Sequence, residues 1–132
     1  MKLIIAGNRE FNDYEDLCKV VDSYPCVISE IVSGGCRGAD ALGERYAREK
    51  GILIKIFPAN WAAFGPSAGP RRNAEMAEYA DAAILFWDRK SKGTRSMYNE
   101  MNARNKLLTI YHKDAIRVEL SHAGVTVFGG LE

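Results

Sequence analysis

The chain has 132 residues, of which 47% are hydrophobic and 27% are charged, and its formal net charge at pH 7 is +1. This length and balance are typical of one globular domain with a buried core. The near-neutral charge excludes the broad basic surface that indiscriminate nucleic-acid binding requires, although it permits a local basic pocket.

The cysteines and histidines are few and lack the spacing of a metal site. Cys18, Cys26 and Cys36 form no C-x-x-C pair, and His112 and His122 are the only histidines. We therefore expect no metal, no cofactor and no disulfide scaffold, which favours a cytoplasmic location. The first apolar run, at residues 3–6, is too short for a signal peptide or a membrane span, so we expect no membrane association.

The first 57 residues alternate between apolar runs, typical of buried strands, and segments with helical periodicity. Asp13 is the candidate N-cap of the first helix, and Gly51 is the expected stop of the second. In chain order, the expected elements are a strand at 2–7, a helix at 13–24, a strand at 27–35, a helix at 39–51 and a strand at 52–57.

Residues 58–70 are rich in Gly, Pro and Ala, and we predict a long irregular loop that exposes Trp61 and Phe64. The alternation then resumes and ends in a segment with alternating valines, which predicts a hairpin or two edge strands. The expected elements are a helix at 71–80, a strand at 82–87, a helix at 94–105, a strand at 106–112 and the hairpin or edge strands at 116–128.

This order predicts an α/β fold, a single Rossmann-like domain over residues 1–130. Strands that alternate with helices form a mostly parallel sheet with helices on both faces. In such sheets, ligands bind beyond the carboxyl ends of the strands, and each unusual motif of this chain falls at one of those ends.

The first two expected strands end in glycine-rich motifs. Gly7 allows the chain to turn, so that Asn8 and Arg9 extend beyond the sheet. The motif SGGCRGAD follows the second strand, where small residues permit close approach and the next helix directs its amides at an anion. Asp40, in the first turn of that helix, either caps the helix or accepts a hydrogen bond from a ribose hydroxyl.

Further polar residues follow the third and fourth strands. Trp61 either packs within its loop or stacks on a base, and Arg71 and Arg72 have the fork geometry that suits phosphate or carboxylate. Singly, such features are often plain turns or solvated side chains, but together they predict a nucleotide-like ligand. The predicted ligand-binding residues are Gly7, Asn8, Arg9, Gly34, Gly35, Arg37, Asp40, Trp61, Arg71, Arg72, Asn73, Ser91, Gly93 and Thr94.

As a set, the motifs GNREFNDY, IVSGGCRGADALGERYA, FPANW, GPRRNAEMAEYADAAILFWD and SKGTRSM resemble the YspA-like, YpsA-related branch of the SLOG superfamily. The likeness covers residues 2–111. It implies a Rossmann-like domain that binds a nucleotide or nucleotide-sugar. The superfamily includes Lonely Guy phosphoribohydrolases, the DNA-processing protein A core and sensor domains for NAD-derived signals.

The Lonely Guy pattern matches this chain in part. Arg72 falls on the arginine that those enzymes use in catalysis, Asn73 replaces their lysine, and Met97 stands where they have a glutamate. Because methionine cannot assist an oxocarbenium-like transition state, the resemblance favours binding over hydrolysis. The alternative is a phosphoribohydrolase in which Arg72 acts with a displaced acid, for which Glu100, one helical turn later, is the candidate.

The segment GPRRN also resembles the Arg-Asn motif of DNA-processing protein A, which binds single-stranded DNA. Single-stranded nucleic-acid binding is therefore a further alternative, although the net charge disfavours a long strand. Relatives commonly dimerise through helices beside the ligand edge, so we consider a homo-oligomer in which Met97, Tyr98 and Met101 form either the interface or part of the core.

Overall fold

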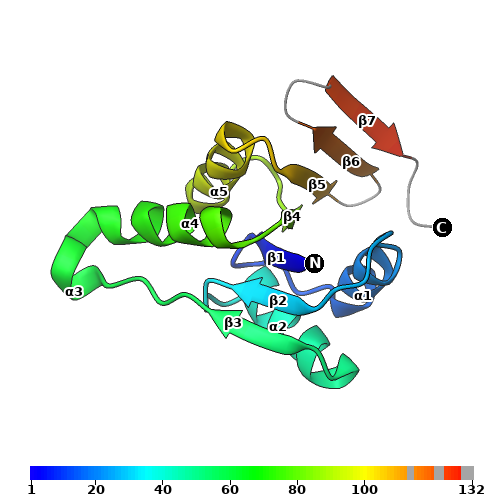
Figure 1. The fold of residues 1–132 in the computed structure, drawn as a ribbon, viewed down its shortest axis with the longest axis horizontal. Coiled ribbons are helices and arrows are strands. Elements are labelled where there is room, and N and C mark those ends of the chain that lie inside the picture. Colours follow the sequence, from blue (N-terminus) through cyan, green and yellow to red (C-terminus); the bar gives the residue numbers. More distant parts are fainter. Residues whose placement is uncertain (113–114, 121–123, 129–132) are drawn as a thin grey trace.

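The computed structural model describes residues 1–112, 115–120 and 124–128, which form one seven-stranded sheet in the order β3-β2-β1-β4-β5-β6-β7. The strands β1 to β5 pair in parallel, as predicted for this α/β fold. The strands β6 and β7 pair antiparallel and extend the edge beyond β5, which confirms the C-terminal hairpin (Figure 1). The strands are β1 (Lys2–Gly7), β2 (Glu30–Ser33), β3 (Leu53–Ile56), β4 (Ala82–Phe86), β5 (Leu107–His112), β6 (Ala115–Leu120) and β7 (Gly124–Phe128).

Helices cover both faces of the parallel part of the sheet, because successive strand residues point to opposite sides. Leu3 and Ile5 of β1 pack in a core with α1 (Tyr14–Asp22) and α2 (Ala39–Lys50). Ile4 and Ala6 pack in a second core with α4 (Ala68–Tyr79) and α5 (Lys92–Ala103). The apolar runs of β1, β2, β4 and β5 are therefore buried, as the sequence predicted. The run of β3 is not, because β3 lies at the edge of the sheet and leaves Leu53 71% and Ile56 47% exposed.

Two predicted helix ends are confirmed. The Asp13 carboxylate accepts a hydrogen bond from the Asp16 amide at 3.0 Å and caps α1. Gly51 follows α2 with a φ of 69°, the left-handed conformation that ends many helices. No helix in the described ranges has both the length and the apolar character to cross a bilayer.

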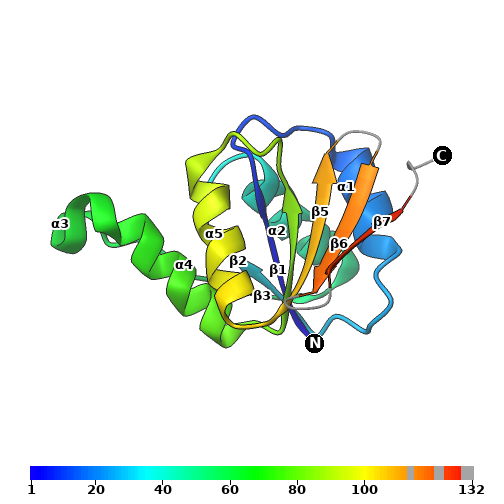
Figure 2. The same cartoon turned by 90° about the horizontal axis from the view of Figure 1, so that it is seen from above.

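The prediction of an irregular loop at 58–70 was wrong, because most of this segment is helical. It contains α3 (Trp61–Phe64) and the 3₁₀ helix η1 (Gly65–Ser67), and α4 begins at Ala68. The Asn60 side chain caps α3 by accepting from the Ala63 amide at 3.0 Å. Pro66 and Pro70 lie in the first turns of η1 and α4, where a helix needs no N–H from them. The α3 end of this segment projects beyond the sheet (Figures 1 and 2).

The fifth helix also begins earlier than predicted, at Lys92 rather than Thr94. Ser91 is its N-cap, and its hydroxyl accepts from the Thr94 amide at 3.3 Å. Gly93 and Thr94 therefore belong to the first turn of α5 rather than to a turn that precedes it. This places the amino end of a twelve-residue helix at the carboxyl edge of the sheet.

Candidate functional site

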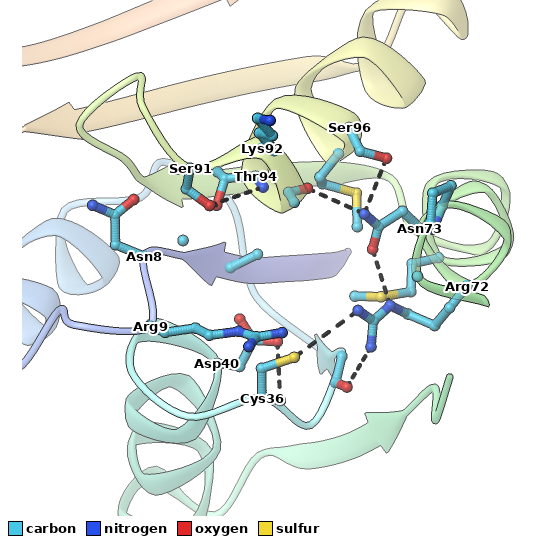
Figure 3. A pocket seen from close by; sticks show the side chains of 18 of the residues that line it. Asn8, Arg9, Cys36, Asp40, Arg72, Asn73, Ser91, Lys92, Thr94 and Ser96 are labelled. Atoms are coloured by element: carbon cyan, nitrogen blue, oxygen red, sulfur yellow. Dashed lines mark hydrogen bonds between the residues drawn. The ribbon is translucent and has the colours of Figure 1, made fainter. Parts of the chain in front are cut away.

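A cavity of about 680 Å³ opens at the carboxyl edge of the sheet, between the loops that follow β1, β2 and β4 and the helices α4 and α5 (Figure 3). Its volume lies within the range of small-molecule sites. The predicted site residues that line it are Gly7, Asn8, Arg9, Gly34, Asp40, Trp61, Arg72, Asn73, Ser91, Gly93 and Thr94.

The remaining predicted site residues do not line this cavity. The exposed Gly35 donates its amide to the Ser33 hydroxyl at 3.0 Å, and the exposed Arg37 pairs with Glu10 at 3.2 Å. Arg71 donates to Ser67 at 3.1 Å and stacks over the Phe64 ring. Glu100, the candidate displaced acid, forms an ion pair with Arg104 of its own helix at 3.1 Å.

One side of the cavity, which we call the α2–α4 wall, consists of Gly34, Cys36, Asp40 and Arg72. The Arg72 guanidinium donates to the Gly34 carbonyl at 2.6 Å and to the Phe57 carbonyl at 3.4 Å. The Asp40 carboxylate accepts from the Cys36 amide at 3.4 Å and from the Gly34 amide. Asp40 does not cap α2, whose N-cap is Gly38, so that alternative is excluded.

Burial raises the pKa of Asp40 to about 6. The Cys36 amide and the charge of Arg72 favour the carboxylate and limit the rise, whereas the charge of Glu44 adds to it. The Asp40 side chain is only 6% exposed, which is consistent with desolvation as the main cause. Asp40 can therefore exchange a proton close to neutral pH.

The opposite side, which we call the α5 wall, consists of Lys90, Ser91, Lys92, Gly93 and Thr94. The Asp88 carboxylate accepts from the Lys90 amide at 2.8 Å and from the Ser91 amide at 3.4 Å, which folds the loop after β4. The buried Trp87 indole donates to the Ser91 carbonyl at 3.2 Å and fixes the end of that loop. This local structure presents the first turn of α5 to the cavity.

Asn73 connects the two walls. Its amide nitrogen donates to the Gly93 carbonyl and to the Ser96 hydroxyl, both at 3.2 Å, while its oxygen accepts from Arg72 Nε at 3.0 Å (Figure 3). Asn73 is only 6% exposed. The residue that replaces the Lonely Guy lysine thus ties α4 to α5.

Gly7, the last residue of β1, and Asn8, which follows it, occupy their positions for different reasons. A Cβ on Gly7 would lie 2.2 Å from the Phe86 carbonyl oxygen, so glycine is required here by the close approach of β4. Asn8 Oδ1 is buried and has no hydrogen-bond partner among the described residues, while the Asn8 side chain also bonds to Asp88. Asn8 therefore holds an enclosed acceptor oxygen beside the cavity.

Several further residues line the cavity that are not among the predicted ligand-binding residues. Lys90 and Lys92 flank the amino end of α5, and Cys36 and Met97 contribute to the floor and sides. Met97 is only 2% exposed and packs in the core, so the position of the Lonely Guy glutamate is apolar here. The sequence signal for Lys92 is its position next to Gly93 and Thr94, in the segment that follows the buried strand β4.

Comparison with known proteins gives two matches. Residues 1–64 match the model of the YspA, cpYpsA-related SLOG family. The Gene 61 protein of Mycobacterium phage D29 is 31% identical over 109 residues, which cover 75% of this chain and 86% of the phage protein. The chain belongs to the YspA, cpYpsA-related SLOG family. No solved structure matches this SLOG chain significantly.

Membership of the SLOG family indicates a nucleotide-related role, in ligand binding or processing. The cavity lies where a parallel α/β sheet of this kind takes its ligands. The carboxyl edge of the sheet is therefore the candidate binding site for a nucleotide-related ligand.

Proposed function

We propose that this SLOG domain binds a nucleotide, a nucleotide-sugar or an NAD-derived small molecule in the cavity, as a signal sensor or a sequestering protein. The observation that carries the proposal is that one cavity combines the amino end of α5, exposed cations and an aromatic ring. Each of these elements suits a different part of a nucleotide.

The phosphate of the ligand would lie at the α5 wall. The N–H groups of Lys92 and Gly93 belong to the first turn of α5, where a helix offers no internal acceptor. The positive end of the helix dipole and the Lys92 ammonium favour an anion at this place. Figure 3 shows Arg9 extending into the cavity from the loop after β1, where it can meet the same charge.

The sugar and base would occupy the rest of the cavity. Asp40 and Asn8 present acceptor oxygens that suit ribose hydroxyls. Trp61 is 54% exposed although it packs against Gly69, so its ring is accessible for stacking on a base. A ligand with an anionic end, a hydroxylated middle and a planar end would therefore satisfy every part of the cavity.

A thermal-shift screen with AMP, ADP-ribose and NAD-derived cyclic nucleotides tests this proposal. A ligand present at 100 times its Kd stabilises a folded protein by about 2.7 kcal/mol, which such a screen detects. Arg9→Gln should reduce the shift, whereas Arg48→Gln, which removes an exposed cation at the far end of α2, should leave it unchanged. The absence of a shift with every compound, in a folded sample, would contradict the proposal.

Hydrolysis of the N-glycosidic bond is the alternative function, and the raised pKa of Asp40 is the observation that favours it. A general acid or base works best with a pKa near the working pH, and Asp40 lines the cavity whereas Glu100 pairs outside it. Incubation with AMP, followed by detection of free adenine, distinguishes turnover from binding. If the Asp40→Asn variant still released adenine at the rate of the wild-type protein, Asp40 would have no catalytic role.

A further inference from the structure

Arg72 uses most of its hydrogen-bonding capacity on the protein itself. A guanidinium has five N–H donors. Those of Arg72 reach the Asn73 side-chain oxygen at 3.0 Å, the Gly34 and Phe57 carbonyls at 2.6 and 3.4 Å, and the Cys36 sulfur at 4.0 Å. Arg72 therefore joins the loop after β2, the loop after β3 and helix α4.

Asp40 holds the same loop from the side of α2. Its Oδ2 accepts from the Cys36 amide at 3.4 Å, and its carboxylate also bonds to the Gly34 amide. A Cβ on Gly34 would lie 2.8 Å from Arg72 Nη1 and 2.9 Å from Asp40 Oδ2. Residues 34–36 are thus enclosed between a cation and a carboxylate, and Gly34 is the residue that fits between them.

We propose that Arg72 and Asp40 form a clamp on residues 34–36, which shapes the α2–α4 wall, and that Arg72 positions this wall instead of binding the anionic group of the ligand. This inference rests on the proposed function only for the identity of the ligand. The anionic group is met by Arg9, which extends into the cavity from the loop after β1, and by Lys92 of the α5 wall.

The distribution of charge supports this division of roles. Asp40 lies close enough to Arg72 for their charges to interact, so the guanidinium already has an anionic neighbour. The Arg9 and Lys92 side chains are exposed, and within residues 1–112 neither donates a hydrogen bond or forms an ion pair. An incoming phosphate gains more from unpaired cations than from one that must first leave its carbonyls and its carboxylate.

The first experiment compares the affinities of AMP and adenosine, which differ by the phosphate. A cation that contacts phosphate contributes to the preference for AMP, whereas a positioning residue affects both ligands equally. Arg9→Gln with Lys92→Gln should reduce the AMP preference at least roughly tenfold, since each removes a charge-assisted hydrogen bond. Arg72→Gln should weaken both ligands by the same factor, and loss of the AMP preference in this variant would overturn the proposal.

The second experiment measures amide hydrogen exchange without any ligand, so it decides on the clamp even where neither AMP nor adenosine binds. Arg72→Gln and Asp40→Asn should each accelerate exchange at residues 34–36 roughly tenfold or more, with residues 92–95 unchanged. Arg48→Gln is the control with the same loss of charge as Arg72→Gln. Unchanged exchange at 34–36 in both clamp variants would overturn the proposal.

Arg72→Lys separates charge from geometry, and it provides a second variant where Arg72→Gln does not fold. Lysine keeps the positive charge but lacks the planar fork that reaches Asn73 and two carbonyls together. We expect faster exchange at residues 34–36 and an unchanged AMP preference. Exchange as slow as in the wild-type protein would show that charge alone holds the loop, which contradicts the clamp.

Discussion

Both walls of the cavity carry cations but use them differently. In the α2–α4 wall, Arg72 and Asp40 are turned toward the backbone of residues 34–36. In the α5 wall, Lys92 is exposed at the first turn of a helix, while Ser91 and Thr94 hold that turn in place. A cation in a cavity is therefore not evidence of a ligand contact until its existing partners are known.

The comparison also changes the meaning of the Lonely Guy resemblance. Arg72 corresponds to a catalytic arginine in that pattern, yet its donors reach the protein's own carbonyls and Asn73. Met97, at the place of the glutamate, is buried in the core. The two positions that would form a hydrolytic pair thus contribute to structure here.

The largest effect is expected from the pH dependence of Asp40. Its folded pKa of about 6 lies above the ordinary value of 3.8, so burial favours the neutral form. The stabilising contribution is complete below pH 3.8 and is lost as the pH rises through 6. The difference between the folded pKa and the ordinary pKa of Asp40 corresponds to about 3 kcal/mol in the free energy of unfolding. Urea unfolding from pH 4 to 8 should show that loss in the wild-type protein relative to Asp40→Asn.

Asp88→Asn is the control for this experiment, because the contribution of Asp88 should stay constant from pH 4 to 8 and change only below that range, with the opposite sign. The Lys90 amide, and to a lesser extent Asn8 and the Ser91 amide, lower the pKa of Asp88. Its contribution is therefore present above the ordinary pKa and is lost as the pH falls. Parallel pH curves for wild type and Asp40→Asn would show that Asp40 is not buried as described.

Gly34→Ala should have the next largest effect. The new Cβ would lie 2.8 Å from Arg72 Nη1 and 2.9 Å from Asp40 Oδ2, so both side chains must move. Overpacking of this kind costs about 1–3 kcal/mol. Denaturant unfolding at pH 7 measures the loss, and AMP affinity should fall with it. An unchanged free energy of unfolding would show that Arg72 and Asp40 can move away from the new Cβ without destabilising the protein.

Lys92→Gln should change ligand binding without changing stability. Surface substitutions usually alter the free energy of unfolding by less than about 0.5 kcal/mol, whereas loss of a phosphate contact weakens binding roughly tenfold. Titration calorimetry with AMP at low and high salt should also show a weaker salt dependence in this variant. Equal salt dependence in both proteins would place the phosphate away from the α5 wall.

The sequence predicted the elements that rest on local patterns. The strands β1 and β4 are continuous apolar runs, and Asp13 and Gly51 are standard helix ends, so each could be identified within a few residues. Residues 61–67 were missed because glycines and prolines obscured a cap at Asn60 and two helix starts. Prolines in a first turn favour a helix, although the same residues elsewhere indicate a loop.

The candidate site was predicted by position but not by contact. Eleven of the predicted residues line one cavity, because they follow parallel strands whose carboxyl ends lie at the same edge of the sheet. The partners of Arg72 were beyond reach, since the Gly34 and Phe57 carbonyls lie 38 and 15 residues away in the chain. Contacts of this kind depend on the final packing of α4 and leave no local signal.

Gly93→Ala should give the smallest effect and the opposite sign to Gly34→Ala. Within the described residues, a Cβ on Gly93 would meet no atom outside its own helical turn within 4 Å, and Gly93 lies in the first turn of α5, where alanine is the better helix former. Thermal and urea unfolding should show a gain of about 0.5 kcal/mol. If the Gly93 amide contacts a phosphate, the added methyl group should nevertheless weaken AMP binding. A stabilised variant with unchanged AMP affinity would leave the cations of the α5 wall, rather than its backbone, as the phosphate contacts.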